Sequence, residues 1–301
     1  MFLIPVRWIV HGIFLSRMNL LIRPNYIARK MNNEAEAEFQ AMRDCKYGLN
    51  TQSREKKIIV SLTTIPSRVD KVRLVVSRIM NQTVKPDKII LYLDKEKKEE
   101  ITFSPELNIL IERGLEIEYV EDIGPHTKYF YSTQKYSDDI VITVDDDIIY
   151  SRKLIETLIK SYRVYPKAVS ANIVVQFLIN DGKPISSSEW LQQFKYGLGN
   201  EKSVAYGVGG VLYPPKVLPK EAFNIDKIRK LSLFQDDLWL KAIETKYKID
   251  VVKARGGDKL FGYFVTVDGS QEITLRSKND DNDRNVKYLN QLNEEFQLWK
   301  V

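Results

Sequence analysis

Apolar residues in this chain fall into short runs, and the stretches between the runs have a helical period. The runs at 58–62, 88–93, 115–120 and 140–144 are five or six residues long and predict buried strands. Between the first two runs, apolar positions recur at spacings of three and four, which indicates an amphipathic helix: Val72, Val75, Val76 and Ile79. Strands that alternate with helices predict an α/β fold of GT-A or Rossmann-like type, with a mainly parallel sheet and helices on both faces.

The second half of the chain has a less regular pattern. It contains a glycine-rich segment around 207–210, a helix that begins near Asp236 and a strand near 250–254. A terminal helix presents apolar side chains at spacings of three and four, namely Leu289, Leu292, Phe296 and Trp299. The polar stretch 31–57 predicts a short helix and a linker. The simplest division is an N-terminal leader and linker at 1–56, one domain at 57–275 and a C-terminal helix at 276–301.

Charge is distributed unevenly along the 301 residues. The chain has 46 Lys and Arg against 40 Asp and Glu, a formal net charge of +6, but residues 1–33 contribute five basic and no acidic residues. The body is therefore almost neutral, whereas a nucleic-acid-binding domain normally spreads basic residues over its surface. We expect no nucleic-acid partner. A single cysteine, Cys45, and two histidines argue against disulfides and against cysteine or histidine metal clusters.

Residues 1–22 are mostly apolar, but Arg7, His11 and Arg17 interrupt them. Such interruptions disfavour a spanning helix, and the segment lacks the basic start and small-residue cleavage site of a signal peptide. An apolar stretch followed by arginines fits a helix that lies on an anionic membrane surface. The alternative is a helix packed on the body or on a partner subunit. We expect a cytoplasmic protein that is peripheral at the inner face of the cell membrane.

Three consecutive aspartates follow the fourth predicted strand, in the sequence IVITVDDDIIY. Side chains alternate along an extended chain, so Asp145 and Asp147 are expected on one face and Asp146 on the other. Two carboxylates on one face at the carboxyl end of a strand suit Mg²⁺ or Mn²⁺, which keep coordination positions for substrate phosphates. The alternative is an acidic cap of the following helix.

The chain resembles bacterial sugar transferases of the GT-A fold, close to glycosyltransferase family 2 and the capsule and lipopolysaccharide enzymes. The resemblance covers about Ile58 to Ala254 and rests on four segments: IIVSLTTIPSR, NQTVKPDKIILYLD, the aspartate triplet and FQDDLW. It implies that Asp147 ligates a divalent metal that bridges the donor diphosphate, and that Asp145 contacts the ribose or the metal. Asp146 belongs to the same implied donor site.

The same resemblance implies further donor-binding residues. The loop after the first strand would cup the nucleotide with Thr63, Thr64, Pro66 and Arg68. Asp94 ends the second strand, where a carboxylate can accept hydrogen bonds from a base or ribose; an ordinary turn residue is the equal alternative. Lys128 could meet a phosphate as a point charge, or it could be a solvated surface lysine. His126 is expected to be a loop residue and not a metal ligand.

Two later segments belong to the acceptor side of the implied site. The segment YGVGGVLYPP contains Gly209 and Gly210, which would line the sugar and acceptor pocket; a hairpin turn is the alternative. In FQDDLW, Asp236 occupies the position of the family's general base, while Gln235 replaces a glutamate and Asp237 is a second candidate. Both aspartates could instead cap the helix that starts here.

These expectations amount to a metal-dependent, hexosyltransferase-like enzyme of bacterial surface polysaccharide synthesis. It would move a sugar from a nucleoside-diphosphate sugar, with a UDP-sugar favoured, to a hydroxyl of a glycan or glycolipid. An inverting mechanism is favoured over a retaining one on the same fold. A nucleotidyltransferase is disfavoured because TTIPSR stands where its glycine-rich loop would follow the first strand. A non-catalytic scaffold at a membrane is the alternative from another class.

Overall fold

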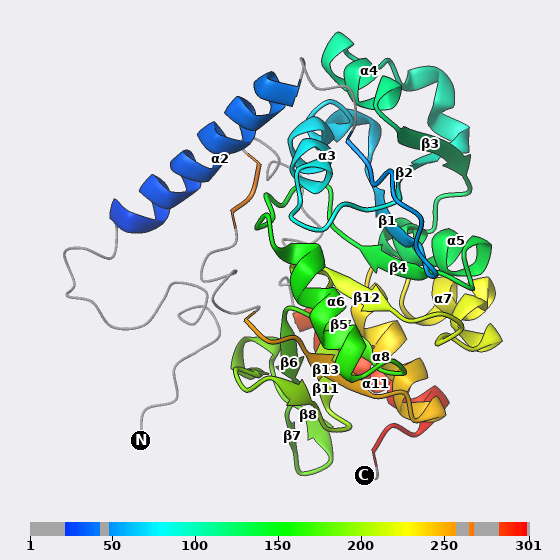
Figure 1. Cartoon of the computed structure of the whole chain (residues 1–301). Coiled ribbons are helices and arrows are strands. Elements are labelled where there is room, and N and C mark those ends of the chain that lie inside the picture. The colour runs from blue at the N-terminus through cyan, green and yellow to red at the C-terminus, as the bar shows by residue number, and fades with distance from the viewer. Residues whose placement is uncertain (1–21, 43–47, 257–264, 268–282, 300–301) are drawn as a thin grey trace.

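The computed structural model describes residues 22–42, 48–256, 265–267 and 283–299. Its centre is an eight-stranded sheet in the order β10-β13-β5-β12-β4-β1-β2-β3 (Figure 1). All strands are parallel except β12 and β10, which run antiparallel to their neighbours. This confirms the predicted α/β class with a mainly parallel sheet. The strands of this sheet are β1 Ile58–Thr63, β2 Lys88–Asp94, β3 Leu115–Val120, β4 Ile140–Thr143, β5 Val169–Ala171, β10 Gly197–Leu198, β12 Val211–Tyr213 and β13 Val251–Lys253.

Helices cover both faces of the central sheet, which explains why the inner strands are mostly apolar. Val60 of β1 lies in the large core cluster together with Val75 of α3 (Val72–Met80). The neighbouring Ile59 points to the other face, where Tyr131 of α5 (Thr127–Lys135) packs against it. Each such side chain contributes roughly 1.5–3 kcal/mol when it is fully buried. The strand runs read from the sequence are therefore the sheet's core.

Smaller elements surround this sheet. A three-stranded sheet and a hairpin extend the second half of the chain; they consist of β6 Val174–Gln176, β9 Leu191–Gln192, β11 Ser203–Ala205, β7 Ile179–Asn180 and β8 Lys183–Pro184. The remaining α-helices are α4 Pro105–Glu112, α6 Leu154–Val164, α7 Ile225–Leu231, α8 Asp236–Tyr247 and α11 Arg284–Phe296. The short 3₁₀ turns are η1 Pro66–Arg68, η2 Lys95–Glu100, η3 Gly124–His126, η4 Ser187–Glu189, η5 Gly207–Gly209 and η6 Lys220–Phe223.

The N-terminal helix α2 (Ile22–Met42) is longer than the short helix predicted within 31–57. Its last turns pack on α3, where Ala35 and Phe39 are fully buried in the main core and Glu36 pairs with Arg73 at 2.8 Å. The described helix α2 thus lies against the body through residues 35–39. Residues 1–21, which carry most of the membrane-docking prediction, lie outside the described residues. Among the described helices, none is both long and apolar enough to span a bilayer.

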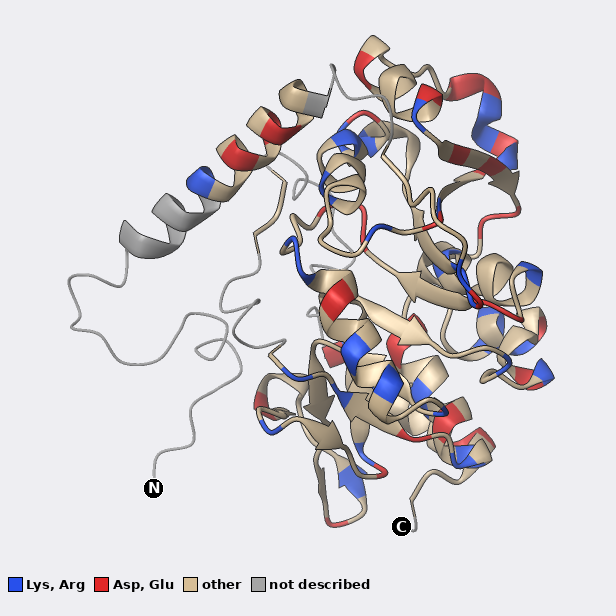
Figure 2. Ribbon diagram, in the orientation of Figure 1, with Lys and Arg blue, Asp and Glu red and all other residues tan. Residues whose placement is uncertain are grey.

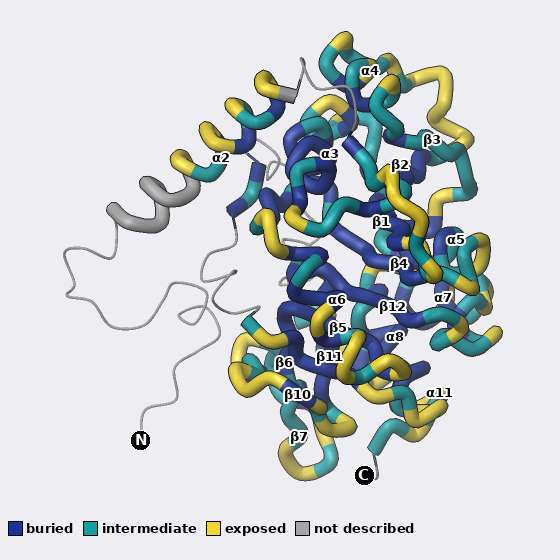
Figure 3. The backbone as a smooth tube through the Cα atoms, viewed as in Figure 1, coloured by how far each residue is buried: buried dark blue, intermediate teal, exposed yellow. Residues whose placement is uncertain are grey.

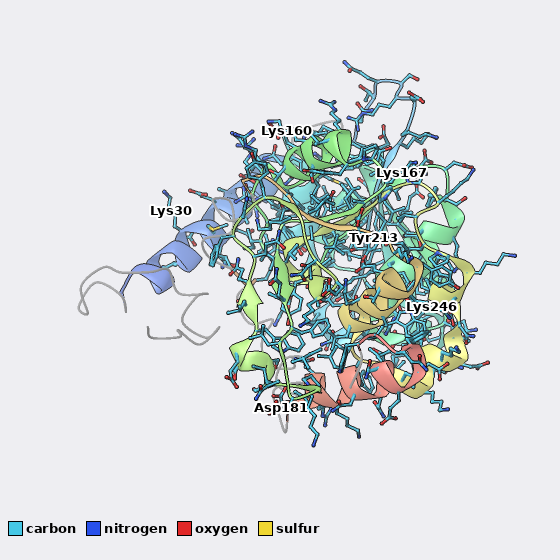
Figure 4. All side chains as sticks on the ribbon, turned by 90° about the horizontal axis from the view of Figure 1, so that it is seen from below. Lys30, Lys160, Lys167, Asp181, Tyr213 and Lys246 are labelled. Atoms are coloured by element: carbon cyan, nitrogen blue, oxygen red, sulfur yellow. The ribbon has the colours of Figure 1, made fainter. Side chains whose placement is uncertain are left out.

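Charged side chains lie mainly on the outside of this fold, although Lys128, Asp236 and Glu244 are among those that are buried. Figure 2 shows Lys and Arg interspersed with Asp and Glu along the described helices, while β4 and β12 carry no charge. Figure 4, a view from below, shows Lys30, Lys160 and Lys246 pointing outward and Tyr213 in the interior, where it is 4% exposed. The mixed surface agrees with a body that is almost neutral.

One row of register partners crosses the sheet where its parallel strands end. We call this row the carboxyl edge, and it runs Ser61, Thr143, Val211, Ala171, Lys253, Gly197. The loops that leave β1, β4, β5 and β13 therefore emerge side by side. In open α/β sheets, ligands bind outside this edge.

Candidate functional site

Side chains from four segments meet beyond the carboxyl edge. The aspartate triplet follows β4, the loop with η1 follows β1, Lys128 lies in the first turn of α5, and Asp236 and Asp237 open α8. We call the five aspartates Asp145, Asp146, Asp147, Asp236 and Asp237 the carboxylate cluster. Two basic side chains, Lys128 and Arg68, form ion pairs with four of these carboxylates, all but that of Asp237.

The triplet divides between the two cations. Lys128 Nζ lies 2.7 Å from Asp145 Oδ1, while the Arg68 guanidinium lies 3.2 Å from both Asp146 Oδ2 and Asp147 Oδ2. The expected alternation of faces is therefore wrong beyond Val144, because β4 ends at Thr143 and the chain turns at 146–147. As a result, Asp146 and Asp147 share one guanidinium.

Asp146 is the most buried member of the triplet. Its residue is 7% exposed, and Thr64 donates a hydrogen bond from its hydroxyl to Oδ2. Burial raises the pKa of Asp146, whereas Arg68 and the Thr64 hydroxyl oppose that rise. Asp146 therefore anchors the loop after β1 to the end of β4, whereas Asp145 and Asp147 are more exposed.

Lys128 is the central cation of the cluster. Besides Asp145 it contacts Asp236 Oδ2 at 3.2 Å, and its side chain is 9% exposed. Burial alone would lower the pKa of Lys128, but the carboxylates of Asp145, Asp236 and Asp237 raise it well above its ordinary value. Lys128 thus stays charged at any physiological pH, and the reading as a solvated surface lysine is wrong.

The two aspartates at the start of α8 have different surroundings. Asp236 pairs with Lys128, whereas Asp237 Oδ1 accepts a hydrogen bond from the backbone N–H of Gly207 at 3.0 Å. Burial, and next the charge of Asp236, raise the pKa of Asp237 well above its ordinary value. Gln235 points elsewhere, because its side-chain amide donates to Asn285 Oδ1 of α11 at 2.6 Å. Gln235 therefore attaches the C-terminal helix to the start of α8.

The glycine segment meets the cluster at Gly207. A Cβ on Gly207 would lie 2.8 Å from Lys128 Nζ and 3.1 Å from Asp237 Oδ1. The two glycines predicted for the site, Gly209 and Gly210, have other neighbours. A Cβ on Gly209 would lie 2.8 Å from the backbone N of Ile173, and a Cβ on Gly210 would contact the Leu154 side chain. Gly210 has φ +77°, which favours glycine. No described contact joins Gly209 or Gly210 to the carboxylates.

Three other predicted donor residues form contacts outside the cluster. Thr63 donates from its hydroxyl to the carbonyl oxygen of Tyr92 at 3.1 Å. Asp94 caps η2, accepting from the backbone N–H of Glu96 at 3.0 Å, as in its turn-residue alternative. Pro66 opens η1 and so fixes the turn that carries Arg68. Within the described residues, none of the three is seen to contact an aspartate of the cluster.

The structure also adds residues that the sequence reasoning missed. The Tyr150 hydroxyl accepts the backbone N–H of Asp145 at 2.8 Å, so the tyrosine of DDDIIY fixes the start of the triplet. Asn172 follows β5 at the carboxyl edge and donates from its amide to the carbonyl oxygen of Gly209 at 3.1 Å. In the sequence, only the position of Asn172 directly after a strand could have indicated that it lies near the site. That signal was weak because β5 has only three residues.

His126 is fully buried beside the cluster. Its Nε2 lies 2.7 Å from the carbonyl oxygen of Ser232, and its Nδ1 lies 3.2 Å from the Tyr129 hydroxyl. Burial lowers the pKa of His126 to about 4, so the ring is neutral at pH 7. It fixes the connection between α7 and α8, which positions Asp236, and it contacts no acidic side chain directly in the described structure.

Carboxylate oxygens, such as those of Asp145 and Asp147, are the ligands that Mg²⁺ or Mn²⁺ prefers. Their side chains are 26% and 17% exposed, so a ligand can reach them. Over the described ranges, no group of three or more His, Cys, Asp or Glu side chains could hold a metal ion. Within the described residues the two carboxylates therefore do not form a closed structural metal site, and a divalent cation stays a prediction.

Comparisons with known proteins give a fold-level likeness. No family model matches the chain, and no curated protein matches it. Among similar solved structures is CMP:2-keto-3-deoxy-manno-octonic acid synthetase complexed with CTP, 11% identical, with 65% of this chain and 88% of that chain covered and a TM-score of 0.40. Francisella tularensis 2-C-methyl-D-erythritol 4-phosphate cytidylyltransferase is 11% identical, with 75% and 99% covered and a TM-score of 0.42.

A third structure, 4-diphosphocytidyl-2C-methyl-D-erythritol synthase, is 9% identical, with 68% of this chain and 92% of that chain covered and a TM-score of 0.39. None of these three is named as a glycosyltransferase, so the resemblance to that family stays a prediction. Similarity this distant carries no conclusion about activity. The chemistry of this chain must be argued from its own carboxylate cluster.

Proposed function

We propose that this protein is a transferase that moves a sugar from a nucleoside-diphosphate donor to an acceptor hydroxyl, with a divalent cation as cofactor. The observation that carries the proposal is the position of Lys128, between Asp145 at 2.7 Å and Asp236 at 3.2 Å. This one ammonium joins the carboxylates suited to a metal–diphosphate group to the carboxylate suited to deprotonate an acceptor. A transfer reaction needs those two functions close together.

The donor diphosphate would enter among Arg68, Lys128 and the triplet. Arg68 and Lys128 both form ion pairs with carboxylates. An incoming diphosphate would take the place of some of these carboxylates as the anionic partner of the two side chains. The fork of Arg68 matches phosphate oxygens, and Lys128 supplies a compact charge. A Mg²⁺ or Mn²⁺ ion on Asp145 and Asp147 would act as a Lewis acid on the diphosphate. The two basic side chains then stabilise the negative charge that develops on the leaving group.

Asp236 is the better candidate for the general base. The Lys128 ammonium contacts Asp236 Oδ2 at 3.2 Å, and a carboxylate held beside the donor site can take the proton of an acceptor hydroxyl. Asp237 has a raised pKa and bonds the backbone N–H of Gly207, so it holds the glycine segment in place. In an inverting reaction, Asp236 accepts the proton of the acceptor hydroxyl as that oxygen attacks the anomeric carbon.

The test begins with ligand binding. A thermal-shift panel of nucleoside diphosphates with Mn²⁺ should raise Tm for at least one nucleotide, since bound ligand at 100 times its Kd stabilises a fold by about 2.7 kcal/mol. The Asp147→Ala variant should fold but lose the metal-dependent part of the shift. Absence of any shift with every nucleotide would remove the proposal and leave the scaffold alternative.

The reaction itself is tested with the nucleotide found in that panel. The matching sugar nucleotides are incubated with the full chain, Mn²⁺ and a mixture of glycan acceptors, and release of nucleoside diphosphate is measured. NMR of the product's anomeric configuration then separates inversion from retention. Release of pyrophosphate from a nucleoside triphosphate and a sugar phosphate, with no glycosyl transfer, would reassign the protein as a nucleotidyltransferase.

A further inference from the structure

A short segment from late in the chain pairs with the end of the aspartate triplet. We call residues 265–267 the return segment, and it runs antiparallel to the chain that leaves the triplet. The backbone N–H of Val267 donates to the carbonyl oxygen of Asp147 at 2.8 Å, and the N–H of Ile149 donates to the carbonyl oxygen of Val265 at 2.9 Å. The backbone of Asp147 is therefore held by a distant part of the sequence.

The return segment is in turn held by the N-terminal helix α2. The side-chain amide of Asn32 donates to the carbonyl oxygen of Thr266 at 3.1 Å. Asn32 is 6% exposed and lies on the same face of α2 as Ala35 and Phe39, which are fully buried in the main core. In Figure 1 the return segment is the orange stretch beside α2, and Figure 3 shows that both of its ends are buried. Helix α2 and the return segment are thus in direct contact.

Asn32 places a polar side chain in the same helical row as two apolar ones. A buried amide that lacks a hydrogen bond is destabilising, and the carbonyl oxygen of Thr266 supplies the partner. Apolar contacts are not directional, whereas a hydrogen bond requires a defined distance and angle. Asn32 therefore fixes the position of the return segment on α2.

Asp147 is held at two points as a result. Its carboxylate pairs with Arg68 at 3.2 Å, and its carbonyl oxygen accepts from Val267. Asp147 lies in a turn beyond the end of β4, so the central sheet does not fix its backbone. A second contact from α2 reaches the chain after the triplet, where Arg152 Nε lies 4.0 Å from Glu38 Oε1. The direction of the Asp147 side chain thus depends on the return segment, and the return segment depends on α2.

We propose that Asn32 is a positioning residue for Asp147 and that it acts through the return segment. Helix α2 then belongs to the body that carries the carboxylate cluster and is not a removable linker. The consequence for donor binding rests on the proposed function, because a bound cation or diphosphate would respond to the direction of the Asp147 carboxylate. Residues that orient a metal ligand from behind typically change metal affinity or activity by about 10–100-fold.

The experiment compares two neighbouring asparagines in the full chain. Asn32→Ala removes the donor that holds the return segment, and Asn33→Ala is the matched control, since Asn33 is exposed in the same turn of α2. Amide hydrogen exchange followed by NMR should become about tenfold faster at Ile149 and Val267 in Asn32→Ala, as the loss of one hydrogen bond predicts. Exchange at Val60 in β1 should stay unchanged, which separates a local release from a general loss of stability.

The second readout is the affinity for Mn²⁺. Tm is titrated with Mn²⁺ in the presence of UDP, or of whichever nucleoside diphosphate shifts the wild-type protein. The Kd for Mn²⁺ should rise about tenfold in Asn32→Ala, the lower end of the range for residues behind a metal ligand. Asn33→Ala should keep the wild-type Kd.

The two readouts separate the possible failures. Unchanged exchange at Ile149 and Val267 in Asn32→Ala, or equal changes in Asn33→Ala, would overturn the role of Asn32. Faster exchange with a wild-type Kd would mean that Asn32 serves the fold and does not position Asp147. If the wild-type protein bound neither Mn²⁺ nor any nucleotide, the proposed function would fail, while the exchange rates would still decide whether Asn32 holds the backbone of Asp147.

Discussion

Lys128 Nζ lies 3.2 Å from Asp236 Oδ2, and this contact joins the start of α5 to the start of α8. Both side chains are nearly buried, at 9% and 8% exposure. An ion pair so enclosed lies in a low-dielectric environment, where removal of one partner leaves an uncompensated charge. Lys128 and Asp236 are therefore expected to contribute both to the stability of the fold and to the proposed reaction.

The Lys128→Met variant should lose both stability and donor binding. Three acidic side chains, Asp145, Asp236 and Asp237, would remain close together without their cation, at a cost of about 3–5 kcal/mol of unfolding free energy. Urea unfolding measures the loss at pH 7.

Lys135→Met is the matched control for that change. Lys135 lies in the same helix and pairs with Glu118 at 2.7 Å, but its side chain is 52% exposed. Exposed pairs contribute at most about 1 kcal/mol. If Lys128→Met cost no more than Lys135→Met, the central role of Lys128 in the cluster would be disproved.

The two aspartates of α8 should respond differently to replacement by asparagine. Asp236→Asn removes the proposed base and should lower kcat by about 10²–10⁴, with nucleotide affinity nearly unchanged. Asp237→Asn keeps an oxygen that can accept from the Gly207 N–H, so we expect less than about a tenfold loss. Steady-state kinetics at saturating donor make the comparison. The opposite order of the two losses would assign the base to Asp237.

The sequence predicted those parts of the fold that depend on local pattern. β1 and β4 were readable because runs such as 58–62 are buried on both faces, and the helix at Val72 was readable from its apolar spacing. α5 was not predicted, since its buried residues include Thr127, Lys128 and Ser132 and give no apolar stripe. The three-residue strands of the second half are too short for a periodic signal.

The sequence predicted the candidate site only where the direction of the parallel strands determines which residues lie at the same edge of the sheet. That Asp145 and Arg68 emerge at one edge follows from parallel strands, and the structure brings them into the same cluster. The sharing of Arg68 between Asp146 and Asp147 depends on a turn at 146–147 that alternation does not predict. The pairing of Gln235 with Asn285 depends on α11, which contacts α8 only in the folded chain.

A methyl group at Gly207 should affect activity more than stability. The Cβ of Gly207→Ala would lie 2.8 Å from Lys128 Nζ, the mobile end of a long side chain, so the ammonium must move while the backbone need not. We expect a change in unfolding free energy below about 1 kcal/mol and at least about a tenfold drop in transfer, as misplacement of a catalytic charge predicts.

Gly209→Ala gives the contrasting case within the same segment. Its Cβ would meet the backbone N of Ile173 at 2.8 Å, which cannot move alone, so the variant should lose about 1–3 kcal/mol of stability. Thermal unfolding and a transfer assay on both variants test the pair. Equal stability losses in the two would show that Gly207 serves packing and not the position of Lys128.

His126 should make stability fall on the acid side. Burial lowers its pKa to about 4 from 6.5, so the unfolded chain binds a proton between these values and the folded chain does not. The contribution of the neutral ring is fully present above pH 6.5 and is lost as the pH falls toward 4, with a slope of about 1.4 kcal/mol per pH unit. Urea titrations of wild type and His126→Asn should differ by that slope. Parallel curves would mean that the ring is accessible to water.

Glu244 should make stability fall on the alkaline side. Burial raises its pKa from 4.5 to about 8 in α8, against the opposing charge of Lys241, so the folded state holds a proton that the unfolded state releases. The stabilising contribution is complete below pH 4.5 and is lost as the pH rises through 8, again by about 1.4 kcal/mol per pH unit.

Glu244→Gln keeps the shape of the protonated side chain and should remove this alkaline slope. Glu294→Gln, at an exposed position of α11, is the control that should leave the slope unchanged. Unfolding free energies at several pH values between 5 and 9 decide the matter. A wild-type slope in Glu244→Gln would mean that Glu244 is ionised in the folded protein, and that Lys241 neutralises it in the core.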